Sequence, residues 1–207
     1  MTQIVIATHN KGKLREFEAM RLMMSPEFPA LNHLEFVPIS TWAGGPPEET
    51  GTSFLANALI KARAAAALTG LPAIADDSGL EVAALGGAPG IFSARYAGVN
   101  ASDADNNTQL LAELSAIAQA DRSARFVCVL AMVRTVDDPA PLIASGFWAG
   151  ELLNHPRGEQ GFGYDPLFFL ADQGKSAAEL PAELKNRISH RAHALANLMT
   201  QLGSTPF

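Results

Sequence analysis

The sequence predicts a mixed α/β fold in which the sheet is not purely parallel. Short apolar segments typical of buried strands alternate with longer segments of helical spacing. Two apolar segments, residues 125–134 and 142–147, are separated only by the turn around Asp137-Asp138-Pro139, which favours an antiparallel pair. The chain has 207 residues, of which 48% are hydrophobic, so it can bury a substantial core and is too apolar to be disordered.

The first half of the chain contains three predicted strands and two predicted helices. The strands are residues 4–7, 35–39 and 73–75, and the helices are residues 11–24 and 53–69. Pro26 ends the first helix and Gly70 ends the second, whereas the glycines and prolines of residues 40–51 predict a loop. The third strand runs into Asp76-Asp77-Ser78, and the end of a strand is a usual place for a site in an α/β protein.

The second half adds two predicted helices around the antiparallel pair. Residues 102–120 and 190–202 have helical spacing, the latter ending at Gly203, and residues 167–169 are strand-like. Residues 86–90 and 158–163 are glycine-rich loops. No repeat or clear linker interrupts the chain, so we expect one domain over residues 1–207.

Composition excludes several classes of protein. The net charge of −6 disfavours nucleic acid as a partner unless basic residues cluster locally. No segment approaches the roughly 20 apolar residues of a membrane span, and no signal peptide is visible. Cys128 is the only cysteine, so an internal disulfide is impossible. We expect a cytoplasmic protein without a membrane or nucleic-acid partner.

The segment from Thr8 to Lys13 follows the first strand and opens the first helix. Backbone N–H groups at a helix start attract anions, and Lys11 and Lys13 add the positive charge that an acidic protein needs beside a phosphate. The alternative is an ordinary helix cap with solvated lysines. The segment is not a P-loop, because G-x-x-x-x-G-K-[ST] is absent.

An acidic centre is predicted where Asp76-Asp77 and the upstream pair Glu48-Glu49 meet. Mg²⁺ in proteins is usually held by one or two carboxylates together with phosphate oxygens and water. A carboxylate can also orient or deprotonate a water for attack on phosphorus. Lys61 could neutralise charge on a leaving phosphate, although a solvated lysine is the simpler interpretation of that residue alone.

The C-terminal third offers groups that suit a purine base. Gly161-Phe162-Gly163-Tyr164-Asp165 combines glycines, which permit close backbone approach, with aromatic rings on which a base can stack. Donors at Lys185, His190 and Arg191 match the acceptor of a 6-oxo purine and not the amino group of adenine. A tight turn with Phe162 in the core is the alternative for the aromatic segment.

These motifs together resemble the Ham1-like inosine triphosphate pyrophosphatases, and within that family the bacterial dITP/XTP members. The resemblance runs from Ile4 to about Leu202. Its motifs, in chain order, are ATHNKGK at residues 7–13, EETG at 48–51, NALIKAR at 57–63, ADDSGL at 75–80, GGAPGIFSARY at 86–96, GFGYDP at 161–166 and SHR at 189–191. Seven motifs in order across the chain make this a specific match.

The resemblance implies an elongated subunit with a long mixed sheet, flanking helices and two lobes around a central substrate cleft, assembled as a homodimer. It implies Mg²⁺-dependent hydrolysis of ITP, dITP and XTP between the α- and β-phosphates. Asp77 would be the general base and, with Glu49, a metal ligand. The implied substrate contacts are Thr8, His9, Asn10, Lys11, Gly12, Lys13 and Lys61 for the phosphates, Ser78, and Phe162, Gly163, Tyr164, Asp165, Lys185, His190 and Arg191 around the base.

Two other hypotheses remain open from the sequence. One is a broader pyrophosphatase that prefers modified pyrimidine nucleotides, which a substrate panel would separate from the purine enzyme. The other is a nucleotide-binding regulator without turnover. The presence of Glu49, Lys61 and Asp77 argues against a regulator, because a sensor has no need of a water-activating centre.

Overall fold

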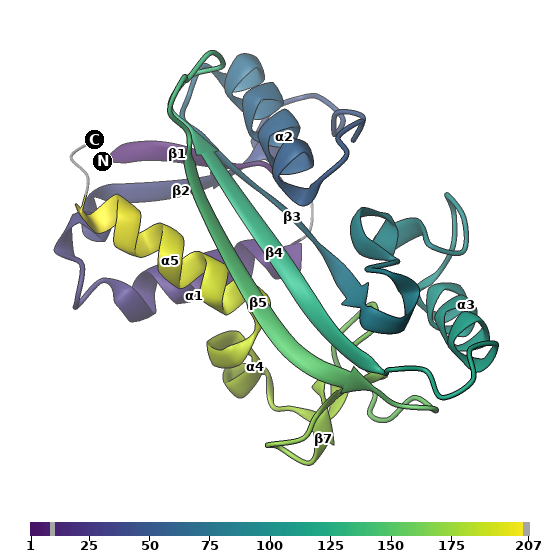
Figure 1. Ribbon diagram of the computed structural model, residues 1–207. Coiled ribbons are helices and arrows are strands. Elements are labelled where there is room, and N and C mark those ends of the chain that lie inside the picture. Colours follow the sequence, from purple (N-terminus) through teal and green to yellow (C-terminus); the bar gives the residue numbers. More distant parts are fainter. Residues whose placement is uncertain (9–10, 205–207) are drawn as a thin grey trace. The chain divides into compact units, whose positions relative to one another are not determined.

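The computed structural model describes residues 1–8 and 11–204, with the side chains of residues 11 and 12 left out of the description. A seven-stranded sheet of order β2-β1-β3-β4-β5-β6-β7 runs through the described residues. The strands are β1 (Thr2–Ile6), β2 (Leu34–Pro38), β3 (Ala73–Val82), β4 (Ser123–Val133), β5 (Leu142–Leu152), β6 (Phe168–Leu170) and β7 (Lys175–Ser176). The helices are α1 (Lys11–Met24), α2 (Phe54–Thr69), α3 (Asp103–Ser115), α4 (Ala182–Ile188) and α5 (His190–Ser204), and five short 3₁₀ helices connect them (Figure 1).

The sheet is mixed, as the sequence predicts. β1 pairs in parallel with β2 and with β3, whereas β6 is antiparallel to both β5 and β7. β4 and β5 are neighbours joined only by residues 134–141, and so short a connection joins antiparallel strands. The expectation of a mixed sheet with flanking helices is therefore confirmed.

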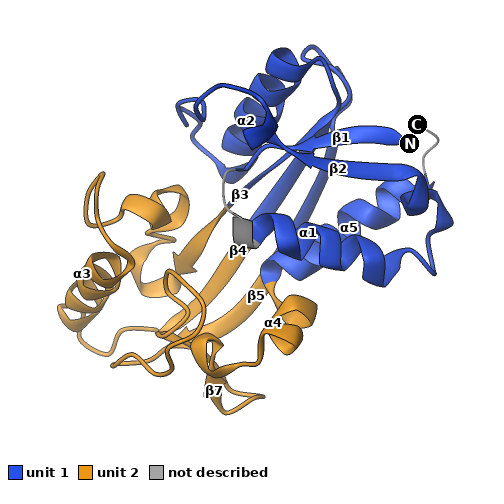
Figure 2. Cartoon of the chain, turned by 180° about the vertical axis from the view of Figure 1, so that it is seen from behind, with its two compact units in different colours: residues 1–77, 128–146, 190–207 blue, residues 78–127, 147–189 orange. Residues whose placement is uncertain are grey.

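The chain divides into two compact units, drawn in different colours in Figure 2. Unit 1 comprises residues 1–77, 128–146 and 190–207, and unit 2 comprises residues 78–127 and 147–189. β3, β4 and β5 each contribute residues to both units. The single two-lobed domain and the substrate cleft expected from the family resemblance stay predictions.

In unit 1 the sheet is covered on both faces. Side chains of β1 alternate, so that Ile4 and Ile6 join α1 and α5 in one apolar cluster while Val5 joins α2 in another. The α2 face is lined by small residues, including Ala58 and Ala62, which are fully buried. Burial on both faces explains why these strands read as unbroken apolar segments rather than alternating ones (Figure 1).

Unit 2 has its own apolar core, centred on aromatic rings. The ring of Phe168 lies 4.6 Å from that of Phe126 and 5.3 Å from that of Trp148, measured between centroids. α3 packs into this core through Leu110 and Leu114, which are 0% and 1% exposed. α3 is therefore fixed in unit 2 by burial of one helical stripe.

The boundaries of the two capped helices follow local chemistry. The Ser53 hydroxyl accepts a hydrogen bond from the Ala56 N–H at 3.1 Å, and Gly70 closes α2 with a φ of 70°. Ser102 and Asp105 form a reciprocal capping box at the start of α3. α3 ends at Ser115, earlier than the predicted residue 120, and Ile117 is 38% exposed rather than part of the apolar stripe.

Further elements also differ from the sequence-based expectations. β3 extends to Val82, so the acidic pair lies inside a ten-residue strand and not at its end. α4 was not predicted, and α5 continues through Gly203 to Ser204. A Cβ on Gly203 would lie 2.7 Å from the ring of Phe28, so this glycine serves close packing instead of ending the helix. No helix among the described residues is long and apolar enough to cross a membrane.

Candidate active site

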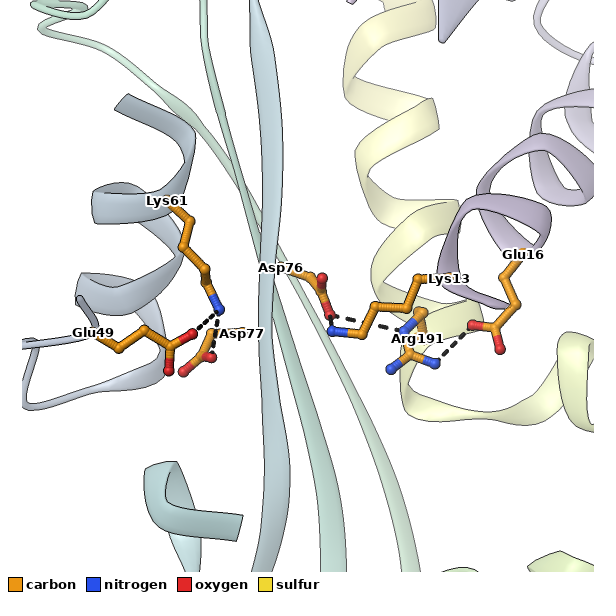
Figure 3. Close-up of polar contacts among 7 residues, drawn as sticks. All are labelled: Lys13, Glu16, Glu49, Lys61, Asp76, Asp77 and Arg191. Atoms are coloured by element: carbon orange, nitrogen blue, oxygen red, sulfur yellow. Dashed lines mark hydrogen bonds and ion pairs between the residues drawn. The ribbon is translucent and has the colours of Figure 1, made fainter. Parts of the chain in front are cut away.

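Asp76 and Asp77 point to opposite faces of β3 (Figure 3). Successive side chains of a strand alternate between the faces of a sheet, so neighbours in sequence enter different surroundings. Both are buried, at 4% and 7% exposure. Each therefore needs a partner for its charge, and in unit 1 each has one.

The face beside α2 brings two carboxylates onto one ammonium. Lys61 Nζ lies 2.8 Å from Asp77 Oδ1 and 3.0 Å from Glu49 Oε1 (Figure 3). Asn57, fully buried one helical turn before Lys61, donates from its amide to Asp77 Oδ2 at 3.3 Å. Lys61 and Asn57 thus both contact the Asp77 carboxylate, and Glu49 shares the lysine.

A glycine brings the Glu49 loop close to α2. The Gly51 N–H donates to Asn57 Oδ1 at 2.8 Å, and a Cβ at Gly51 would lie only 2.5 Å from that oxygen. The loop can therefore approach the helix so closely only with glycine at this position. Asn57 ties this loop to β3 through its two amide atoms, since it also binds Asp77.

Burial is the main influence on the charge of Asp77, and it raises the pKa of this carboxyl above its ordinary value. Lys61 opposes the effect without cancelling it, and Glu49 adds to it. For Lys61, burial alone would lower the pKa, but Asp77, together with Asp76 and Glu49, more than compensates and the pKa of the ammonium is raised. The arrangement keeps a more basic carboxylate than a solvated aspartate next to a fixed positive charge.

The residues present fit a Mg²⁺ ion. Glu49 and Asp77 supply two carboxylates that already converge on one cation, the Lys61 ammonium, and Mg²⁺ is commonly bound by one or two carboxylates with the rest of its oxygens from phosphate and water. Within residues 1–8 and 11–204 no group of three or more His, Cys, Asp or Glu side chains forms a complete metal cage. The pair of Glu49 and Asp77 therefore suits a metal whose other ligands include the phosphate oxygens of a substrate.

The opposite face holds a charge network across three elements. Asp76 Oδ2 accepts from Lys13 Nζ of α1 at 2.6 Å and lies 3.9 Å from Arg191 Nε of α5. Arg191 Nη1 lies 2.7 Å from Glu16 Oε2 of α1 (Figure 3). Burial would raise the pKa of Asp76, but Lys13 and Arg191 hold that pKa well below its ordinary value. Asp76 is therefore a permanent anion that links β3 to both helices.

The predicted phosphate segment is described only in part, since His9 and Asn10 lie outside the described residues. Thr8 follows β1, with its N–H donating to the Ile6 carbonyl at 2.9 Å, and residues 11–13 open α1 as expected. Lys13 forms the ion pair with Asp76 instead of being solvated.

In unit 2 the aromatic segment presents one ring to solvent. Phe162 is 50% exposed, with Lys185 Nζ lying 5.0 Å from its ring centroid. The Asp165 carboxylate, 3% exposed, accepts from Lys185 Nζ at 2.5 Å and from the Phe162 N–H at 2.8 Å. One buried carboxylate thus fixes both the cation and the backbone of the exposed ring.

Tyr164 has a different position from Phe162. It is 4% exposed within the unit 2 core, and its hydroxyl donates to the Ser93 carbonyl at 2.8 Å. The sequence left open that Phe162 lies in the core. The aromatic residue in the core is instead Tyr164, and Phe162 is exposed. Of the remaining predicted contacts, Ser78 follows Asp77 in β3, and His190 begins α5, buried at 6% exposure.

Two residues of the unit 1 networks were not predicted from the sequence. Asn57 could have been found, because it precedes Lys61 by one helical turn and so shares its face of α2. Nothing in the sequence indicated that Glu16 belongs to the network, because its partner Arg191 lies far away along the chain.

Comparisons with known proteins identify the family of this chain. The Ham1 family model matches residues 4–201. A dITP/XTP pyrophosphatase of Pseudomonas aeruginosa is 51% identical over 203 residues, covering 98% of each chain. The solved structure of a HAM1 protein from Coxiella burnetii superimposes with a TM-score of 0.91 at 47% identity, covering 99% of this chain and all of that one. The Staphylococcus aureus Ham1 structure gives a TM-score of 0.84 at 42% identity, covering 97% and 98%. This chain belongs to the Ham1 family.

Proposed function

We propose that this chain hydrolyses non-standard purine nucleoside triphosphates, dITP, ITP and XTP, to the monophosphate and pyrophosphate. The observation that carries the proposal is the convergence of Glu49 and Asp77 on Lys61, within the residues that the Ham1 family model matches. Relatives at about half identity over the whole chain are named dITP/XTP pyrophosphatases, which supports the same reaction here.

In the proposed reaction Asp77 takes the proton of the attacking water at one of its carboxylate oxygens. Its raised pKa suits this role, since a general base works best when its pKa approaches the working pH. Asn57 and Lys61 orient the carboxylate so that it faces the reacting phosphate in one position.

Glu49 and Asp77 are the residues proposed to hold Mg²⁺, which when bound would neutralise phosphate charge and polarise the phosphorus. Lys61 then stabilises negative charge that develops on the phosphates during cleavage. Thr8 to Lys13, including His9, Asn10, Lys11 and Gly12, form the remainder of the proposed phosphate contacts, and Ser78 adds a hydroxyl.

The base is proposed to stack on Phe162, the exposed ring of its segment. Asp165 and Lys185 offer an acceptor and a donor beside that ring, and the backbone of Gly163 and Tyr164 completes the contact surface. His190 and Arg191 stay proposed base contacts. A site that pairs with the 6-oxo group leaves polar groups unpaired when adenine enters, which gives the discrimination.

Hydrolysis of these nucleotides would remove deaminated purines before polymerases incorporate them. We propose a cytoplasmic homodimer for this task, following the family resemblance. The substrate is a small molecule, and the net charge of −6 does not favour a nucleic-acid partner.

The test is a product analysis with dITP, XTP, dGTP, dATP and a modified pyrimidine triphosphate, each with Mg²⁺ and with EDTA. We expect pyrophosphate and monophosphate from dITP and XTP with Mg²⁺, and little from dGTP or dATP. Orthophosphate as the first product would identify a phosphatase instead. Preference for the pyrimidine would favour the broader pyrophosphatase, and binding without any product would favour the regulator.

A further inference from the structure

The backbone of Gly163 is held on both sides by α3, an element that supplies none of the predicted site residues. The Gly163 N–H donates to Asp103 Oδ2 at 2.6 Å, and its carbonyl accepts from Asn107 Nδ2 at 3.0 Å. Asp103 and Asn107 lie one helical turn apart, so they share a face of α3. All three residues belong to unit 2.

Gly163 is the residue at which the aromatic segment changes direction. Its φ of +61° places it in the left-handed region. On one side of it the Phe162 ring is half exposed, and on the other Tyr164 is buried and bonded to Ser93. The two peptide groups at Gly163 therefore set the direction in which the Phe162 ring leaves the core.

The two hydrogen bonds that join Asp103 and Asn107 to Gly163 form a clamp, and α3 supports this clamp rigidly. Leu110 and Leu114 anchor the helix in the core, and a capping box fixes its first turn. Asn106 binds the preceding loop through both amide atoms, accepting from the Ala97 N–H at 2.9 Å and donating to the Ala94 carbonyl at 3.3 Å. A hydrogen bond from such a helix restricts its partner more than a bond from a loop does.

The other side of the segment is fixed by Asp165, which accepts from the Phe162 N–H and from Lys185. The segment is thus held from two directions, by α3 at Gly163 and by α4 through Lys185. Asn107 is buried at 9% exposure while Asp103 is exposed, so the Asn107 bond is the better protected of the two α3 contacts.

We infer that Asp103 and Asn107 are positioning residues that set the geometry of the Phe162 stacking surface, and hence the choice of base. The inference rests on the proposed function, in which Phe162 and Lys185 contact a purine. Neither residue touches the reacting phosphate in this scheme. Their loss should therefore weaken base binding and base discrimination while leaving the chemical step nearly unchanged.

The test uses the opposite hydrogen-bonding roles of the two side chains, an acceptor at Asp103 and a donor at Asn107. Asp103 must accept a hydrogen bond, and an amide oxygen still can, so Asp103→Asn should behave like the wild type while Asp103→Ala should not. Asn107 must donate, and a carboxylate cannot, so Asn107→Asp should be at least as damaging as Asn107→Ala. The same exchange of acid and amide is thus expected to be harmless at one position and harmful at the other.

The expected effect of Asn107→Asp is an increase in KM for dITP and in the Kd for inosine monophosphate of about fivefold to tenfold, the loss of roughly one buried hydrogen bond. We expect kcat to change less than twofold and the preference for dITP over dGTP to fall. Asp103→Ala should show the same pattern more weakly. Inosine monophosphate binding measured by calorimetry makes the readout independent of turnover.

The matched control is Asp105→Ala, in the same first turn of α3. Among the residues that the structure describes, Asp105 bonds only within the cap at Ser102, so its loss should lower the melting temperature without changing base preference or inosine monophosphate affinity. The inference is overturned if the Asn107 variants keep wild-type KM and base preference. If they do not fold, equal behaviour of Asp103→Ala and Asp103→Asn overturns it. Absence of pyrophosphate release by the wild type would instead remove the proposed function.

Discussion

Asp76 and Asp77 are adjacent in the sequence but have opposite electrostatic surroundings. Asp77 shares one lysine with Glu49, and burial raises its pKa. Asp76 faces Lys13 and Arg191, which lower its pKa. The difference follows from strand alternation, which sends one side chain to α2 and the other to α1 and α5. At the residue scale the pair therefore divides into a reactive carboxylate and a structural one.

Asp77→Asn is expected to lower kcat by about 10²- to 10⁴-fold, the usual contribution of a general base. Asparagine keeps the shape of the side chain but cannot take a proton from water. Substrate binding, measured by calorimetry with a nonhydrolysable dITP analogue, should remain detectable. Asp137→Asn, at an exposed turn, is the control and should keep wild-type turnover. Near-normal turnover of Asp77→Asn at saturating Mg²⁺ would leave Asp77 as a metal ligand only.

Asp76→Asn is expected to change stability and its dependence on pH. The pKa of Asp76 is lowered in the folded protein, so its stabilisation is fully present above the ordinary value of 3.8 and is lost as pH falls through the folded value. At pH 7 the variant removes the buried partner of Lys13, whereas Arg191 keeps its ion pair with Glu16, and this loss costs about 3 kcal/mol.

The measurement for Asp76→Asn is urea unfolding from pH 7 to pH 2. The difference from the wild type should be largest at neutral pH and should begin to shrink below about pH 4, because the unfolded wild-type chain then takes up a proton at Asp76 that the folded protein, with its lowered pKa, does not. A difference that is constant over the whole range would show that the charge of Asp76 does not stabilise the fold.

At the element scale, contact between β5 and α5 depends on a glycine. A Cβ at Gly146 would lie 2.1 Å from the His190 carbonyl oxygen and 2.3 Å from the Ala194 nitrogen, both backbone atoms of α5. Gly146→Ala should therefore displace the helix that carries Arg191. We expect a loss of about 1–3 kcal/mol or more, or roughly 5–10 °C in Tm, together with reduced kcat/KM.

Gly45→Ala is the matched control for Gly146→Ala. No atom lies within 4 Å of the Cβ position at Gly45, which is in the exposed loop before α2. Its Tm should stay within about 2 °C of the wild type, since alanine adds no clash and slightly restricts the unfolded chain. If both variants melt together with the wild type, the close approach of β5 and α5 is not required for stability.

Elements whose ends are marked by local chemistry could be predicted closely. The bounds of α1 agree with the prediction, and Ser53 and Gly70 delimit α2 as expected. β3 was underestimated because Asp76 and Asp77 have low strand propensity, and their charged partners on α1, α2 and α5 stabilise them within the strand. α4 was missed because its seven residues show no buried apolar stripe.

For the whole molecule, the sequence predicted a mixed sheet and the residues of the acidic centre, but not their connections. Glu49 and Lys61 were both expected near Asp77, and Lys61 lies 3.0 Å from Glu49 and 2.8 Å from Asp77, while the roles of these residues stay predictions. The link from Glu16 to Arg191 joins positions 175 residues apart, and the clamp of Asp103 on Gly163 joins positions 60 apart. Such pairs follow from tertiary packing, which periodicity and local propensity do not encode.

Removal of the metal should separate folding from activity for the whole molecule. Glu49 and Asp77 are already paired with Lys61, and no larger group of metal-ligating side chains occurs in the described part of the chain. EDTA should therefore abolish pyrophosphate release from dITP while changing Tm by less than about 1 °C, because the fold does not depend on the metal.

Mg²⁺ with a nonhydrolysable dITP analogue at 100 times its Kd should then raise stability by about 2.7 kcal/mol, or roughly 5–10 °C in Tm. Mg²⁺ with the corresponding dATP analogue at the same concentration is the control and should raise Tm much less. A large fall of Tm in EDTA alone would instead make the metal part of the folded structure, and turnover that persists in EDTA would exclude Mg²⁺ from the reaction.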